Sequence, residues 1–66
     1  MKTIPIRFEE VGSGNYSLDM FLPAPPRVGE HVEIDGFNWL VTEVTWVIET
    51  DPKAMTTNFS VIAMIK

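Results

Sequence analysis

The sequence predicts an all-β fold, a small and strongly bent barrel or β roll of five strands. Apolar residues recur at a spacing of two, and β-branched or aromatic residues dominate the longer apolar runs. Clusters of Gly, Pro, Asn and Asp separate these runs at short intervals, and no segment shows a clear helical periodicity. A chain of 66 residues has room for one core, so residues 1–66 are expected to form a single domain.

The first strand is expected over residues 2–9, where Ile4, Ile6 and Phe8 alternate with polar residues. Pro5 lacks an amide donor, so this strand should lie at a sheet edge or point that position away from the ladder. The cluster Gly12-Ser13-Gly14-Asn15 can adopt positive φ and should reverse the chain.

A second strand is expected over residues 16–22, pairing with either the first strand or the last. Its inward set is Tyr16, Leu18, Met20 and Leu22, which leaves Phe21 on the opposite face. The following Pro23-Ala24-Pro25-Pro26 should form a stiff surface loop, because it has three missing amide donors and fixed φ angles.

A third strand is expected within residues 27–34, with a bend at Gly29 and with Val32 and Ile34 facing inward. Asp35-Gly36 lies between two apolar runs and is the strongest hairpin signal in the sequence.

The segment 37–50 changes its apolar phase partway. Trp39 and Val41 share one parity, whereas Val44, Trp46 and Ile48 share the other. A β-bulge near Thr42-Glu43 would bring all five onto one face and bend the strand sharply. Without a bulge, the two tryptophans would lie on opposite faces.

Residues 50–58 are expected to form a polar loop, in which Lys53-Ala54-Met55 could make a single helical turn. The last strand is expected over residues 59–65. One face would carry Phe59, Val61, Ala63 and Ile65, and the other Ser60, Ile62 and Met64.

The stretch from Pro26 to Val44, PRVGEHVEIDGFNWLVTEV, resembles the central hairpin of SH3-like small barrels, which include small proteins of phages and mobile elements. The resemblance consists of spacing and covers under a third of the chain. It implies an SH3-like fold and a phage or mobile-element origin, and it carries over no functional residues.

Composition argues against several classes of function. The net charge is −4, the pI is about 4.6, and the five cations are scattered at Lys2, Arg7, Arg27, Lys53 and Lys66, so nucleic acid is a poor candidate partner. The absence of Cys excludes disulfides and thiolate metal sites. No apolar run approaches the length of a membrane span or signal peptide, so no membrane association is expected and cytoplasmic residence is the default.

No arrangement of residues predicts catalysis or a cofactor. No serine has a neighbouring base, and Gly12-Ser13-Gly14 lacks the third glycine and the lysine of phosphate-binding loops. His31, Glu33 and Asp35 would share one strand face and could hold a divalent cation, although alternation of polar residues on a solvated face explains them more simply. We therefore expect no enzyme, no cofactor and no metal site.

The surplus of apolar residues in the C-terminal half predicts an interface. If the other face of the last strand fills the core, Ile62 and Met64 face outward, Val47 joins them, and Phe21 and Leu40 enlarge the patch. A contiguous exposed apolar patch usually marks a binding surface, so we expect self-association or docking of a protein partner through this outer face. Alternatively, the Pro-rich loop or the 51–58 loop covers it.

A second hypothesis is single-stranded nucleic-acid binding on aromatic stacking surfaces. It would use Tyr16 or Trp39 for stacking and Arg7 or Arg27 for phosphates, and it requires a local positive stripe. A core position is the favoured interpretation for Trp39 and Trp46.

Overall fold

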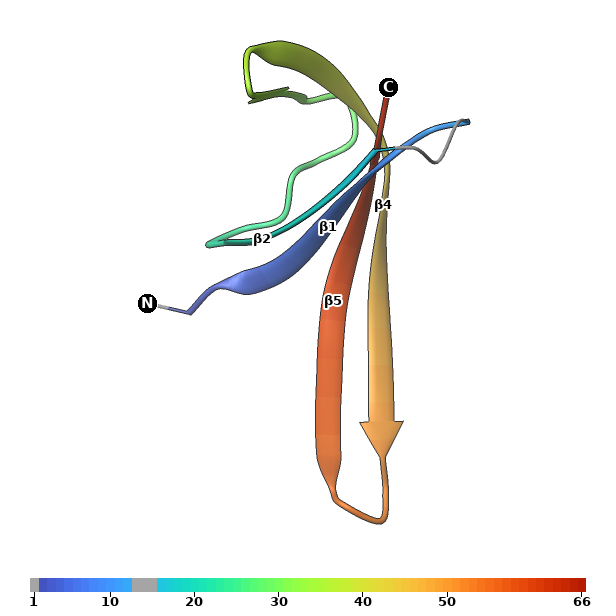
Figure 1. Cartoon of the computed structure of the whole chain (residues 1–66). Helices are drawn as coiled ribbons and strands as arrows, with labels where there is room; N and C mark the ends of the chain where they lie inside the picture. The colour runs from blue at the N-terminus through green and yellow to red at the C-terminus, as the bar shows by residue number, and fades with distance from the viewer. Residues whose placement is uncertain (1, 13–15) are drawn as a thin grey trace.

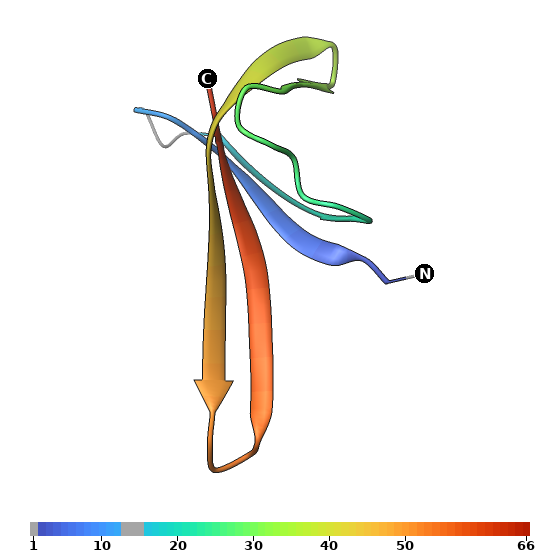
Figure 2. The ribbon, with the colours of Figure 1, turned by 180° about the vertical axis from the view of Figure 1, so that it is seen from behind.

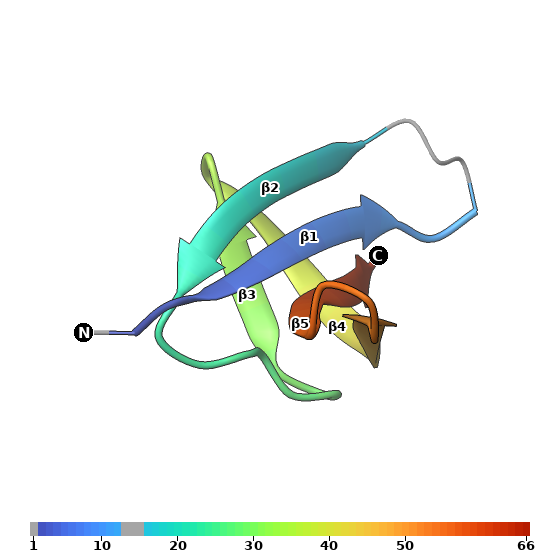
Figure 3. The same cartoon turned by 90° about the horizontal axis from the view of Figure 1, so that it is seen from below.

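The sequence folds into one curled β-sheet. The computed structural model describes residues 2–12 and 16–66, and these form five strands and no helix. The sheet curls into a half-barrel, as Figures 1 and 3 show, which confirms the predicted all-β, strongly bent class. In chain order the strands are β1 (Ile4–Glu10), β2 (Ser17–Leu22), β3 (His31–Ile34), β4 (Phe37–Asp51) and β5 (Thr56–Ile65).

The first and last strands lie side by side in the middle of the sheet. The strand order is β2-β1-β5-β4-β3, and β1 runs parallel to β5 from Ile6↔Val61 onward. The second strand pairs antiparallel with the first strand and not with the last. β1 is therefore not an edge strand. Pro5 is tolerated because the ladder to β5 begins one residue after it, so that the missing amide meets only one neighbouring strand.

The Asp35-Gly36 hairpin forms as predicted. Both residues have positive φ, 51° and 85°, which is the type I′ geometry that matches the right-handed twist of two antiparallel strands. The turn fixes the register of β3 against β4 by pairing Ile34 with Phe37.

The predicted β-bulge is present in β4. Val41 pairs with Ile65 and Glu43 pairs with Met64, so Thr42 is the extra residue. The Thr42 hydroxyl donates a hydrogen bond to the Met64 carbonyl oxygen at 3.3 Å. The bulge places the apolar residues on both sides of it on one face and bends the strand.

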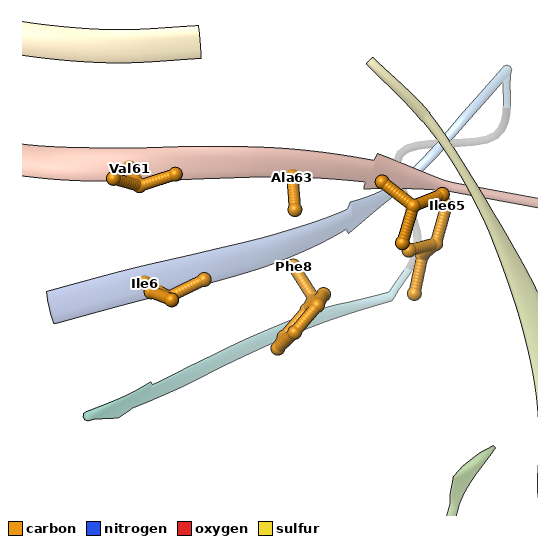
Figure 4. Close-up of a cluster of buried hydrophobic side chains, with 6 residues drawn as sticks. Ile6, Phe8, Val61, Ala63 and Ile65 are labelled. Atoms are coloured by element: carbon orange, nitrogen blue, oxygen red, sulfur yellow. The ribbon is translucent and has the colours of Figure 1, made fainter. Parts of the chain in front are cut away.

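The core occupies the concave face of the sheet. Six side chains are at most 2 % exposed, and they come from β1, β4 and β5 (Figure 4): Ile6, Phe8, Val41, Val61, Ala63 and Ile65. Half-buried residues of the predicted inward sets pack around them, namely Ile4, Tyr16, Leu18, Leu22, Val32, Ile34, Trp39 and Val44. Met20 lies on the same face but is 36 % exposed, because it stands on the edge strand β2.

The predicted polar loop at residues 50–58 is wrong for most of its length. β4 continues to Asp51 and β5 begins at Thr56, so only a short turn at residues 52–55 connects them. The Asp51 carboxylate closes this turn by accepting hydrogen bonds from the backbone N–H groups of Lys53 and Ala54, at 3.0 and 3.3 Å. The other predicted reversal, at Gly12-Ser13-Gly14-Asn15, falls mainly on residues outside the described ranges.

The long β4–β5 hairpin extends beyond the rest of the sheet. We call residues 43–60 the arm; its turn lies at the far end of the molecule in Figures 1 and 2. The arm makes the molecule elongated: the radius of gyration is 13.2 Å, whereas a compact chain of this length has about 11 Å.

The Asp35-Gly36 turn gives a test of the fold. Gly36→Val is expected to destabilise the protein by about 1–3 kcal/mol, because a β-branched residue is strained at positive φ. A Cβ at this position would meet no atom within 4 Å, so the expected loss of stability comes from backbone strain and not from a steric clash. Gly36→Asn is the matched control and should lose less, since Asn tolerates this conformation. Urea unfolding measures both, and equal losses would contradict the assignment.

Candidate functional site

The inner face of the arm carries an exposed apolar cluster. Trp46 and Ile48 come from β4 and Phe59 from β5, and they are 49 %, 63 % and 45 % exposed. The rings of Trp46 and Phe59 stack with centroids 6.2 Å apart and planes 29° apart, and Ile48 lies directly opposite Phe59 in the ladder. We call these three residues the arm cluster.

The arm cluster lies on the same concave face as the core, but its side chains are exposed. Trp46 pairs with the fully buried Val61, and the bulge places both on the concave side. The predicted core position of Trp46 is wrong, although its predicted face is right. β1 reaches β5 only from Val61 onward, so no described strand packs beside the cluster.

Both edges of the arm are free in the part of the chain that the structure describes. On the β4 side, the ladder to β3 ends at Leu40, and the last backbone contact is the hydrogen bond from the Val41 N–H to the Glu30 carbonyl oxygen, 2.9 Å. On the β5 side, residues 56–60 have no neighbour except β4. An isolated two-stranded hairpin is at best marginally stable in water, and unpaired edges are templates for another strand.

The outer face of the arm is acidic. Glu43, Glu49 and Asp51 belong to the same parity of β4 and are exposed, and Lys53 in the turn is the arm's one cation. The inner face of β4 in the arm therefore presents aromatic and aliphatic groups, whereas the outer face combines these carboxylates with Thr45 and Val47.

The predicted outer apolar patch lies on the convex face and is partly covered. Val47, Ile62 and Met64 are half-buried, as is Leu40, whereas Phe21 is 70 % exposed. An open groove of about 420 Å³ lies beside Phe21 and Ile62, and its lining comes from strands alone: Pro5, Ile6, Arg7, Asp19, Met20, Phe21, Ser60 and Ile62. Neither the Pro-rich loop nor the 52–55 turn contributes to this groove. The role of the patch as an interface stays a prediction.

An ion pair forms one wall of this groove. Arg7 of β1 and Asp19 of β2 are register partners, and the guanidinium donates two hydrogen bonds to the carboxylate, Nε to Oδ1 at 2.8 Å and Nη2 to Oδ2 at 3.2 Å. The hydrogen bond from Arg7 lowers the pKa of Asp19, and the same contact raises the pKa of Arg7.

Tyr16 and Trp39, the residues predicted for nucleic-acid stacking, belong to the packing around the core. Tyr16 and Trp39 stack on each other, with centroids 5.4 Å apart and planes 14° apart, and both pack against the core. Arg7 is engaged with Asp19. The sequence did not identify Trp46 and Phe59 as an exposed pair. Alternation of apolar and polar residues predicts the face on which a side chain lies, but its exposure also depends on how far the neighbouring strands extend, which alternation does not predict.

The three residues that were weighed as possible cation ligands, and not favoured, do not gather into a cluster. His31 and Glu33 are exposed on the edge strand β3, and Asp35 is exposed in the turn. Among residues 2–12 and 16–66, no group of three His, Cys, Asp or Glu side chains is placed to hold a metal ion.

Comparisons with known proteins identify no relative. No family model, no curated protein and no solved structure matches this chain. None of the described residues belongs to a helix that could cross a membrane.

The Arg7–Asp19 pair predicts a pH dependence. Because the folded-state pKa of Asp19 is depressed, the pair stabilises the fold above the unfolded pKa of about 3.9, and this stabilisation is lost as the pH falls through the folded pKa. NMR titration should give Asp19 a midpoint below that of an ordinary aspartate. Arg7→Gln should return the midpoint to the ordinary range, and an unchanged midpoint would contradict the geometry.

Proposed function

We propose that this protein is a non-enzymatic protein-interaction module that docks its partner through the arm. The observation that carries the proposal is the arm cluster, three large apolar side chains exposed together on a projecting hairpin. Aromatic residues supply much of the binding energy in protein interfaces.

The size of the molecular surface supports this proposal. The chain has 5063 Å² of accessible surface, whereas a compact monomer of this mass has about 4,200 Å². The excess of roughly 800 Å² is what one partner buries in an interface of standard size. The projecting arm contributes to this excess surface, which is available for contact with a partner.

The small core supports it as well. Six side chains carry the buried interior, and the arm adds exposed apolar surface to a chain whose size already limits stability. Full burial of a large apolar side chain contributes about 1.5–3 kcal/mol. The three side chains of the arm cluster are already about half buried. Docking would therefore contribute only part of this free energy at each of them.

The outer patch is proposed as a second contact of the same module. It comprises Phe21, Val47, Ile62 and Met64, and Val47 belongs to the arm itself. The proposal includes cytoplasmic residence, with which the lack of Cys is compatible. The nucleic-acid alternative is less well supported, because Tyr16 and Trp39 occupy each other's faces and the arm carries more carboxylates than cations.

The proposal is tested by removing the arm cluster. The double variant Trp46→Ser/Phe59→Ser should lose association, either with a protein captured from cell extract or with itself in sedimentation, and it should keep the wild-type NMR dispersion outside the arm. Phe37→Ser is the matched control, because Phe37 is 70 % exposed at the opposite end of β4; it should bind like the wild type. A wild-type protein that captures nothing and stays monomeric at high concentration would contradict the proposal.

The two tryptophans should differ in their contribution to stability. Trp39→Ala is expected to cost on the order of 3 kcal/mol, because that ring packs against Tyr16 and the core. Trp46→Ala should cost clearly less, because half of that side chain is already in water. Thermal or urea unfolding of the two variants checks the order, and the reverse order would place Trp46 in the core.

A further inference from the structure

We infer that the free edge of β4, residues 43–51, takes up an extended protein segment in which apolar and basic residues alternate. This inference rests on the proposed function and names its partner: a strand that extends the sheet from the arm, a mode of recognition called β-augmentation.

The backbone of this edge is available. The ladder on the β3 side ends at Leu40, and the backbone hydrogen bonds from Gly29 and to Glu30 reach only Val41. In an antiparallel ladder, alternate residues direct their N–H and C=O groups to each side. Residues 43–51 therefore present a row of donors and acceptors for which the described chain supplies no further strand.

The two faces of β4 specify the side chains of the incoming strand. Val44, Trp46 and Ile48 lie on the inner face, so the inward positions of a partner strand would be apolar and would complete the arm cluster. Glu43, Glu49 and Asp51 lie on the outer face, with Thr45 and Val47 between Glu43 and Glu49. Basic residues at the outward positions would face these carboxylates, and opposite charges across a strand pair are favourable.

The acidic face argues against a second copy as the occupant. Pairing of two β4 edges around a two-fold axis would bring the carboxylates of both copies onto one face, and like charges opposite one another are destabilising. Each copy also carries a net charge of −4. A partner of opposite charge avoids both penalties.

The edge of β5 in the arm has no comparable pattern. Residues 56–60 are fewer, and the outward positions Thr56, Asn58 and Ser60 are uncharged. The β4 edge is longer and carries three carboxylates on the face opposite its apolar cluster, so it is the edge that can select a sequence.

The test uses a synthetic nine-residue peptide of alternating valine and lysine, with a valine–glutamate peptide as its control. The valine–lysine peptide should bind the intact protein, bind less at high salt, and slow hydrogen exchange of alternate amides in residues 43–51. The control peptide should bind roughly tenfold more weakly or not at all.

Charge exchange makes the test specific. Glu43→Lys/Glu49→Lys should lower affinity for the valine–lysine peptide about tenfold and raise it for the valine–glutamate peptide. Glu33→Lys is the control, because it reverses a charge on β3, outside the arm, and the peptide preference should stay. Equal binding of both peptides to the wild type, or no change on exchange, would overturn the inference.

The outcomes separate this inference from the proposed function. If neither peptide binds while a captured protein is still lost in Trp46→Ser/Phe59→Ser, the function stands and the alternating basic partner is wrong. A dimer that depends on Trp46 would overturn the inference in favour of a second copy. If no association depends on Trp46, both this inference and the proposed function are wrong.

Discussion

The parallel pairing of the first strand with the last is the constraint on which the rest of the structure depends. It places Ile6 and Phe8 of β1 beside Val61, Ala63 and Ile65 of β5, and these five side chains make up most of the fully buried core. The pairing spans only the last five residues of β5. The rest of that strand continues with β4 as its one neighbour, so the arm exists because β1 is shorter than the hairpin that it packs against.

The bulge at Thr42 determines what the arm presents. Because the side chains of a strand alternate, one extra residue reverses the face of everything after it. With the bulge, Trp46 and Ile48 lie on the same side as Val41. Without it, they would share a face with Ile62 and Met64, and the carboxylates of Glu43 and Glu49 would follow on from the core side. A single inserted residue thus keeps Trp46 and Ile48 on the opposite face from the carboxylates of Glu43 and Glu49.

Local features of the sequence predicted much of this fold. The Asp35-Gly36 turn and the bulge could be inferred because turn chemistry and a change of phase act over a few residues. The position of β1 next to β5 could not, since nothing local records a contact between residues so far apart in the chain. The polar residues Thr56 to Asn58 suggested a loop, whereas they form a strand because β4 supplies their hydrogen-bond partners. For Trp46, the pattern predicted the correct face and the wrong burial, since burial depends on where the ladder between β1 and β5 begins.

The charges on the arm also limit how its exposed edge can pair with another strand. Charged residues on an edge strand usually prevent unwanted pairing, and three carboxylates on β4 oppose pairing with an identical strand. They lie on one face only, however, and the other face holds Trp46 and Ile48, which gain from being covered. The same alternation that repels a second copy therefore favours a strand with cations at its outward positions. On this argument the arm is a selective edge, in which charge excludes like strands and apolar contact supplies the attraction.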